Sequence, residues 1–129
     1  MAAWDPRVPR YFNLLGDLYH NEAGNNREAE VVYRRALEVA ENNSDAEACE
    51  ESLNNLALLL LSQSKAEEAE ALLRRLLVSL QESRGLEHPE TGVCLENLSA
   101  ALRQLGRNAE ASEYRTRASR ISRNTRSNN

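Results

Sequence analysis

The chain has 129 residues, a formal net charge of −4 and a hydrophobic content of 41%. This length allows one domain, and the longest apolar run, Leu56–Leu61, is far shorter than the roughly 20 residues of a membrane-spanning helix. Alanine, leucine, glutamate and arginine make up just over half of the chain, whereas valine, isoleucine and threonine together supply ten residues. Because the first set favours helices and the second favours strands, the composition predicts an all-α protein and excludes sheet-based nucleotide-binding folds.

Apolar residues recur at helical spacing along most of the chain. This pattern predicts six antiparallel helices, near residues 10–22, 26–42, 45–62, 66–83, 89–104 and 108–123. Ser44 and Ser64 each stand three residues before a glutamate, so we expect them to cap the third and fourth helices. His88 is expected to begin the fifth helix, ahead of Pro89. Residues 1–9 are expected to form a lead-in, and residues 124–129 a polar disordered tail.

The helices belong to an internal repeat. When the chain is shifted by 42 residues, Leu53, Leu56 and Leu60 fall on Leu95, Leu98 and Leu102. A fainter copy lies upstream at a shift of 40 to 41, which implies one extra residue in the turn around Ala23, Gly24 and Asn25. Three two-helix units, at about 10–42, 45–83 and 89–123, are therefore expected in one domain over residues 10–123. Stacked hairpins of this kind form a short right-handed α-solenoid.

Small residues recur at fixed places in the repeat. They are Gly16, Ala57 and Ser99 in the first helices, and Ala29, Ala69 and Ala111 in the second helices. A small side chain lets two helix axes approach closely, so these positions are expected to be packing contacts between helices.

The pattern Leu15-Gly16-x-x-Tyr19, followed by Ala29-x-x-x-Tyr33-x-x-Ala36, resembles the tetratricopeptide repeat. The second and third units, from residues 53–57 through 85–91, more narrowly resemble the kinesin-light-chain type. The resemblance covers nearly the whole chain and implies a non-catalytic scaffold or peptide-binding adaptor. The sequence departs from the family in two places. Arg115 replaces an aromatic residue, and Glu41 and Gln81 stand where the family has proline. A polar last helix that serves as its own cap would explain the first departure.

Residues that could carry catalysis or bind a metal do not cluster along the chain. His20 and His88 lie in different repeats, and there is no glycine-rich phosphate loop or HExxH motif. Cys49 and Cys94 lie 45 residues apart, unlike zinc ligands, and are expected to be small packing residues in a reducing compartment. We therefore expect no enzyme, no cofactor, no metal site, and a cytoplasmic location.

The candidate functional surface is the concave face, which the first helices of stacked hairpins line. Asparagine is a mediocre helix former, yet it recurs at Asn55 and Asn97, and an amide can both donate to and accept from a peptide backbone. In proteins that the chain resembles, asparagines at these positions hold bound peptides. The predicted partner-binding residues are Asn13, Asp17, Asn54, Asn55, Leu58, Ser62, Glu96, Asn97 and Arg103. The alternative is that Asn55 and Asn97 bond to a neighbouring helix or face water.

Leu58, between the amides, favours a partner with an apolar anchor. Some tetratricopeptide domains clamp a C-terminal carboxylate with cationic residues, but Asn13, Val93 and Asn97 stand where those domains carry their bases. No such clamp is expected here.

Two other functions stay open. The chain could be a structural subunit of a larger assembly or a homodimer, because three repeats are near the minimum for a stable stack. It could also contact nucleic acid, since residues 115–129 carry five arginines and no acid, but the rest of the chain is acidic and this reading is less favoured.

Overall fold

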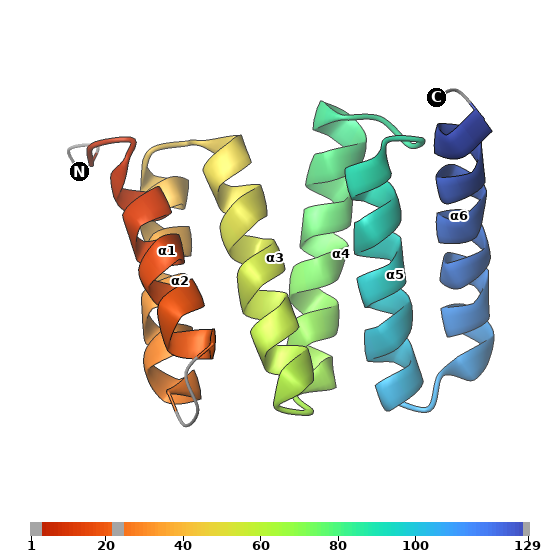
Figure 1. Cartoon of the computed structure of the whole chain (residues 1–129), viewed down its shortest axis with the longest axis horizontal. Coiled ribbons are helices and arrows are strands. Elements are labelled where there is room, and N and C mark those ends of the chain that lie inside the picture. The colour runs from red at the N-terminus through yellow and green to blue at the C-terminus, as the bar shows by residue number, and fades with distance from the viewer. Residues whose placement is uncertain (1–3, 22–24, 128–129) are drawn as a thin grey trace. The chain divides into compact units, whose positions relative to one another are not determined.

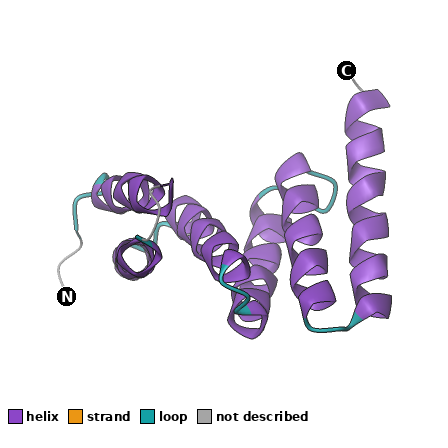
Figure 2. Ribbon diagram, turned by 60° about the horizontal axis from the view of Figure 1, so that its bottom comes forward, coloured by secondary structure: helices purple, strands orange, loops and turns teal. Residues whose placement is uncertain are grey.

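The computed structural model describes residues 4–21 and 25–127, and in them it contains six α-helices and no strand (Figures 1 and 2). The helices are α1 (Val8–Asn21), α2 (Asn26–Asn42), α3 (Ala46–Ser62), α4 (Ala66–Ser83), α5 (Pro89–Gln104) and α6 (Asn108–Ser127). This confirms the predicted all-α fold and the number and order of its helices. Within the described ranges, no helix is both long and apolar enough to cross a membrane.

The last helix is longer than predicted. It ends at Ser127 instead of residue 123, so the tail expected from residue 124 is helical as far as it is described, and residues 128–129 lie outside the description. The hydroxyl groups of the added residues bond back along the helix. Thr125 Oγ1 donates to the Ile121 carbonyl (2.9 Å) and Ser127 Oγ donates to the Arg123 carbonyl (3.1 Å), both four residues back along the helix. The extra residue predicted near Ala23 and Gly24 also lies outside the described residues.

The chain divides into two compact units, Met1–Leu59 and Leu60–Asn129. In the first unit α1 packs against α2, and in the second unit α5 packs against both α4 and α6. Buried alanine, leucine and tyrosine side chains fill the core of the first unit, including Ala29, Tyr33, Ala36, Leu53 and Leu56. Leucines dominate the second core, including Leu73, Leu76, Leu95, Leu98 and Leu102.

The predicted small positions are packing contacts. A Cβ atom on Gly16 would lie 2.6 Å from Cδ1 and 2.9 Å from Cζ of the Tyr33 ring, so only a glycine lets α1 approach α2 this closely. In the second unit Ser99 Oγ donates to the Ala111 carbonyl (2.8 Å), which joins the small position of α5 to that of α6. The hydroxyl is therefore satisfied inside the core.

The capping-box predictions at Ser44 and Ser64 are wrong. Both serines have left-handed backbones, with φ of 52° and 60°, and each ends the preceding helix. The next backbone amide bonds to the carbonyl five residues back, from Asp45 N to Ala40 O (3.0 Å) and from Lys65 N to Leu60 O (2.9 Å). This is the Schellman arrangement of a helix C-terminus, and the short turns leave each serine in its left-handed position.

The caps of the next helices come from other residues. Asp45 Oδ1 accepts a hydrogen bond from Ala48 N (3.1 Å) at the start of α3, whereas Lys65 makes no side-chain cap for α4. His88 begins α5 as predicted, because its Nδ1 accepts a hydrogen bond from Glu90 N (3.1 Å).

Replacing Ser64 by glycine should stabilise the protein. A left-handed backbone costs an L-residue about 1–2 kcal/mol, and the greater freedom of an unfolded glycine offsets about 0.5–1 kcal/mol of the gain. We expect a net increase of about 0.5–1 kcal/mol in the free energy of unfolding, measured by urea titration. Gly106, which holds the same place between α5 and α6 with φ of 78°, shows the residue that the repeat accepts there.

Ser119→Gly is the matched control, since Ser119 is also an exposed serine but lies inside α6. Glycine in a helix is unfavourable, so this variant should lose stability. Equal effects of the two substitutions would contradict the conformational argument.

Candidate interaction surface

In the first unit, one strip of α3 remains outside the core. It carries the predicted residues Asn54, Asn55 and Leu58, the amides half-buried and the leucine 39% exposed. Asn54 interacts with another group of the chain. Among the residues that the structure describes, the Asn55 side chain has no hydrogen-bond partner. An amide with its donors and acceptor available, one turn from an exposed leucine, is suited to contact an extended peptide.

Asn13 does not lie on this surface, and its prediction as a binding residue is wrong. The side chain is 1% exposed, and its Nδ2 donates to Ser52 Oγ on α3 (3.1 Å), which is also buried. Asn13 instead joins two helices of the core. The sequence pattern placed Asn13 on the concave face, opposite the core, but the structure buries it and the Ser52 hydroxyl satisfies its amide. Asn13 thus makes the kind of bond to a neighbouring helix that was the alternative for Asn55 and Asn97.

Asp17 is half-buried, and its Oδ1 accepts a hydrogen bond from the Tyr33 hydroxyl (2.6 Å). Burial raises the pKa of Tyr33 above its ordinary value, and the bond to Asp17 raises it further. Asp17 therefore has a structural role as well as a charge that faces the surface.

The surface beside Asn54 and Asn55 is acidic. Burial raises the pKa of Glu51, and the charges of Asp17 and Glu47 raise it further, while Arg10 acts in the opposite direction. Sequence reasoning missed Glu47 and Glu51, although they stand eight and four residues before Asn55, which places all three on one side of α3.

In the second unit, α5 presents the predicted residues Glu96, Asn97 and Arg103 outside its core, and the last turn of α3 presents Ser62. Glu96, Arg103 and Ser62 are exposed, whereas Asn97 is half-buried. Asn97 and Ser62 both interact with other groups of the chain. The structure places Glu96, Asn97 and Arg103 along one side of α5.

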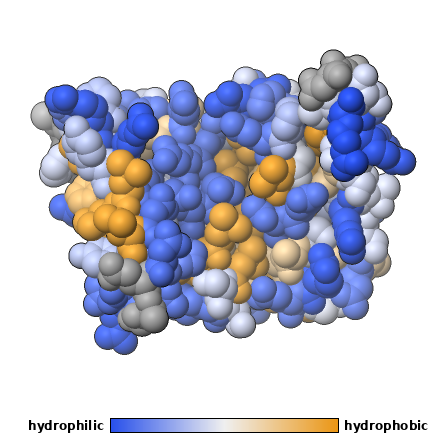
Figure 3. Space-filling model, in the orientation of Figure 1, coloured by the Kyte–Doolittle hydropathy of each residue, from blue (hydrophilic) through white to orange (hydrophobic). Residues whose placement is uncertain are grey.

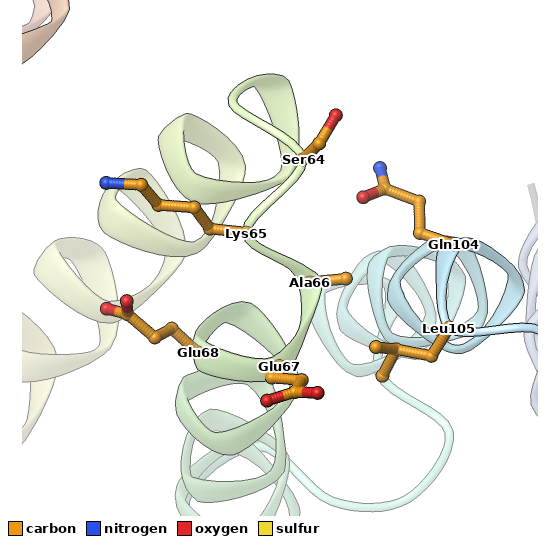
Figure 4. Close-up of a pocket in the computed structure, with 7 residues that line it drawn as sticks. All are labelled: Ser64, Lys65, Ala66, Glu67, Glu68, Gln104 and Leu105. Atoms are coloured by element: carbon orange, nitrogen blue, oxygen red, sulfur yellow. The ribbon is translucent and has the colours of Figure 1, made fainter.

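A shallow hollow of about 480 Å³ lies at the turn before α4, next to the end of α5 (Figure 4). Lys65, Glu67 and Glu68 line one side, and Gln104 and Leu105 the other. Figure 4 shows the Lys65 side chain pointing away from Gln104, so the polar groups diverge. In the described part of the chain, no group of three or more His, Cys, Asp or Glu residues could hold a metal ion. The hollow thus has no converging set of groups for chemistry.

A polar network joins α4 to α6 in the second unit. Arg74 bonds to Glu70 and, through Nη1, to the Tyr114 hydroxyl (3.1 Å), and Arg107 bridges Glu70 and Glu110. Arg107 holds the pKa of Glu110 below its usual value. The contacts of Arg74 with Tyr114 and of Arg107 with Glu70 join residues far apart in the chain, so helical spacing does not predict them.

The arginine-rich end of α6 is partly engaged by the chain itself. The guanidinium carbons of Arg117 and Arg74 lie 5.6 Å and 5.7 Å from the centroid of the Tyr114 ring. Tyr114, one residue before Arg115, thus provides an aromatic ring near the place where the family has one.

We expect Cys94 to make the stability of the protein sensitive to alkali. Its side chain is buried, its Sγ lies 3.4 Å from the Leu73 carbonyl, and burial raises the pKa of the thiol from 9.0 to about 12. Below pH 8 the thiol is neutral in both states. Above pH 9 the unfolded chain loses this proton while the folded chain keeps it, so stability falls as pH rises.

We expect this thiol to lower the free energy of unfolding by about 1.4 kcal/mol between pH 8 and pH 10, measured by urea titration. Cys94→Ala should remove that loss relative to the unmodified chain. Cys49→Ala, which changes a cysteine that is not fully buried, should retain it. The same pH dependence in all three proteins would contradict the prediction.

Known proteins share this arrangement of helices. Residues 48–124 match a family model described as a tetratricopeptide repeat, and residues 12–47 match a second model of the same description. Comparison with curated proteins gives no match. Among solved structures, a Podosopora anserina protein described as a kinesin light chain with nearly identical tetratricopeptide-like repeats is similar, with a TM-score of 0.83 and 20% sequence identity.

That match covers 95% of this chain and 59% of the other, so this chain spans less than two thirds of that structure. At this level of identity the similarity concerns the fold. The first family model matches more than half of the residues, and the small residues of the repeat pack between helices as expected. The chain belongs to the tetratricopeptide repeat family.

Proposed function

We propose that this protein is a non-catalytic interaction module that binds an extended segment of a partner protein along the first helices of its repeats. Tetratricopeptide repeats generally mediate protein–protein interaction, and the chain belongs to that family. The observation that carries the proposal is the pair formed by Asn55 and Leu58 on α3. The amide has no partner among the described residues, and the leucine one turn away is exposed.

In this proposal Asn55 bonds to the backbone of the bound segment, and Leu58 receives an apolar side chain of the partner. Asn97 on α5 is the corresponding amide of the second unit and is proposed to make the same kind of contact there. The acidic groups Asp17 and Glu51 favour a segment that carries lysine or arginine near that apolar residue. Glu96 and Arg103 on α5 contribute to the choice of partner through their exposed charges.

The test begins with a peptide selected from a displayed random library by binding to the purified protein. Its affinity is then measured by calorimetry for the unmodified chain and for variants. One backbone hydrogen bond is worth about 1 kcal/mol, so Asn55→Ala should weaken binding about fivefold. The double variant Asn55→Ala, Asn97→Ala should weaken it about thirtyfold if the two contacts are independent.

Asn124→Ala, on the exposed surface of α6, is the matched control and should leave the affinity unchanged. Leu58→Ser should also weaken binding, whereas Val78→Ser, at an exposed valine of α4, should not. Circular dichroism should first show that all variants keep their helices. Full affinity in the double asparagine variant would rule out backbone capture by these amides.

A further inference from the structure

Helix α1 has an apolar face that none of the described residues covers. Tyr11, Leu14, Leu15 and Leu18 follow the spacing i, i+3, i+4, i+7 on α1, and their exposed fractions are 58%, 53%, 38% and 63%. Figure 3 shows an apolar patch at the left, over α1. The buried residues of α1, which include Asn13 and Gly16, lie on the opposite side of the helix. We call Tyr11, Leu14, Leu15 and Leu18 the α1 stripe.

The stripe is unlike the exposed face of the last helix. On α6 the exposed positions include Thr116, Ser119, Arg120 and Arg123, and only Ala111, Ala118 and Ile121 are buried. Helix α1 exposes apolar side chains instead, and an exposed apolar stripe of this kind marks an interaction site.

The charges at its edge indicate what covers the stripe. Arg10 and Asp17 lie seven residues apart on the same edge of α1, one in the first half of the helix and one in the second. The other edge carries the uncharged residues Phe12 and Tyr19. If a second copy of α1 runs antiparallel to the first, the positive end of this edge in one copy faces the negative end in the other.

We propose that the α1 stripe packs against the same stripe of a second copy of this chain, with the two α1 helices antiparallel. The two-fold axis passes between Leu14 and Leu15, so Tyr11 of one copy lies near Leu18 of the other. This symmetry keeps like edges together, and Arg10 of each copy therefore meets Asp17 of the other. A parallel pair would set the charged edge against the edge of Phe12 and Tyr19 and would form neither ion pair.

The interface is small. Four apolar side chains and one ion pair from each copy are fewer than the roughly 20–30 residues a side of a stable complex. The dimer should therefore dissociate on dilution, and salt should weaken it because its ion pairs lie at the exposed rim.

Sedimentation velocity over about a hundredfold range of concentration tests the proposal by mass action. The sedimentation coefficient of the unmodified chain should rise from the monomer to the dimer value. Leu18→Ser should stay at the monomer value. Val31→Ser is the matched control, because Val31 on α2 is also 63% exposed but lies outside the stripe, and it should dimerise normally. A chain that remains monomeric throughout, or equal dimerisation of Leu18→Ser, would overturn the proposal.

Charge reversal tests the antiparallel arrangement. Arg10→Asp and Asp17→Arg should each dimerise poorly alone, because like charges then meet across the axis. An equimolar mixture of the two variants restores both opposite pairs and should dimerise as the unmodified chain does. A mixture that stays monomeric, with both variants folded by circular dichroism, would overturn the antiparallel pairing. If Asp17→Arg fails to fold, the salt dependence of the unmodified dimer decides, and its absence would exclude the ion pairs.

Discussion

Replacing Gly16 by alanine should lower the stability of the first unit. The new Cβ would lie inside van der Waals contact with three carbons of the buried Tyr33 ring. Overpacking of this kind costs about 1–3 kcal/mol, and the better helix propensity of alanine offsets up to about 1 kcal/mol. We therefore expect a net loss of about 1–2 kcal/mol in the free energy of unfolding, measured by urea titration with circular dichroism.

The sign of this effect should depend on residue 33. The repeat places Ala57 at the position of Gly16 and Leu73 at the position of Tyr33, so a small side chain and a leucine already occur together there. In a Tyr33→Leu background the ring is gone. The same Gly16→Ala change should then raise stability by up to about 1 kcal/mol through helix propensity.

Gly92→Ala supplies the control for this pair of measurements. The new Cβ would lie 3.1 Å from Ile121 Cγ2. Because this aliphatic side chain can shift, the loss of stability should be smaller than for Gly16→Ala. Tyr33→Leu alone also removes the bond to Asp17, and for this reason the comparison is made within each background. A loss of the same size in both backgrounds would show that the Tyr33 ring is not the cause.

The helices and their order were predictable because each repeat has an apolar face at helical spacing. The same spacing was ambiguous for α1. Its leucines at 14, 15 and 18 are at least 38% exposed, while Asn13 and Gly16 are buried, so residue hydrophobicity alone chooses the wrong face. The residues on the neighbouring helices decide which face of α1 is buried, because Tyr33 fills the space above Gly16 and Ser52 satisfies the amide of Asn13.

The asparagines show the same limit of sequence reasoning. Asn13, Asn54, Asn55 and Asn97 all stand in first helices, yet their surroundings differ. Asn13 is a core residue, Asn54 and Asn97 interact within the chain, and Asn55 has no partner in the described residues.

The turn serines were ambiguous for a similar reason. Ser44 and Ser64 satisfy the pattern of a helix start, but the shortness of the turns places them at the end of the helix before.

Replacing Leu98 by alanine should cause the largest loss of stability among these substitutions. Leu98 is fully buried on α5, the helix that packs against both α4 and α6. Truncating a buried leucine removes its transfer free energy and leaves a cavity, so we expect a loss of about 2–5 kcal/mol in the free energy of unfolding. Leu86→Ala makes the same change in the same unit, but Leu86 is 59% exposed and should lose less than about 0.5 kcal/mol.

The thiol of Cys94 provides a local readout of this loss. Cys94 is buried one turn before Leu98, so an alkylating reagent reaches it only when the second unit opens. A loss of at least 2 kcal/mol should increase the population of the open unit, and hence the labelling rate at fixed pH, by about thirtyfold or more. The rate in Leu86→Ala should stay near that of the unmodified chain. If Leu98→Ala lowered the global stability but left Cys94 labelling unchanged, the thiol would be reached by a local fluctuation of α5, and the second unit would not open as one cooperative body.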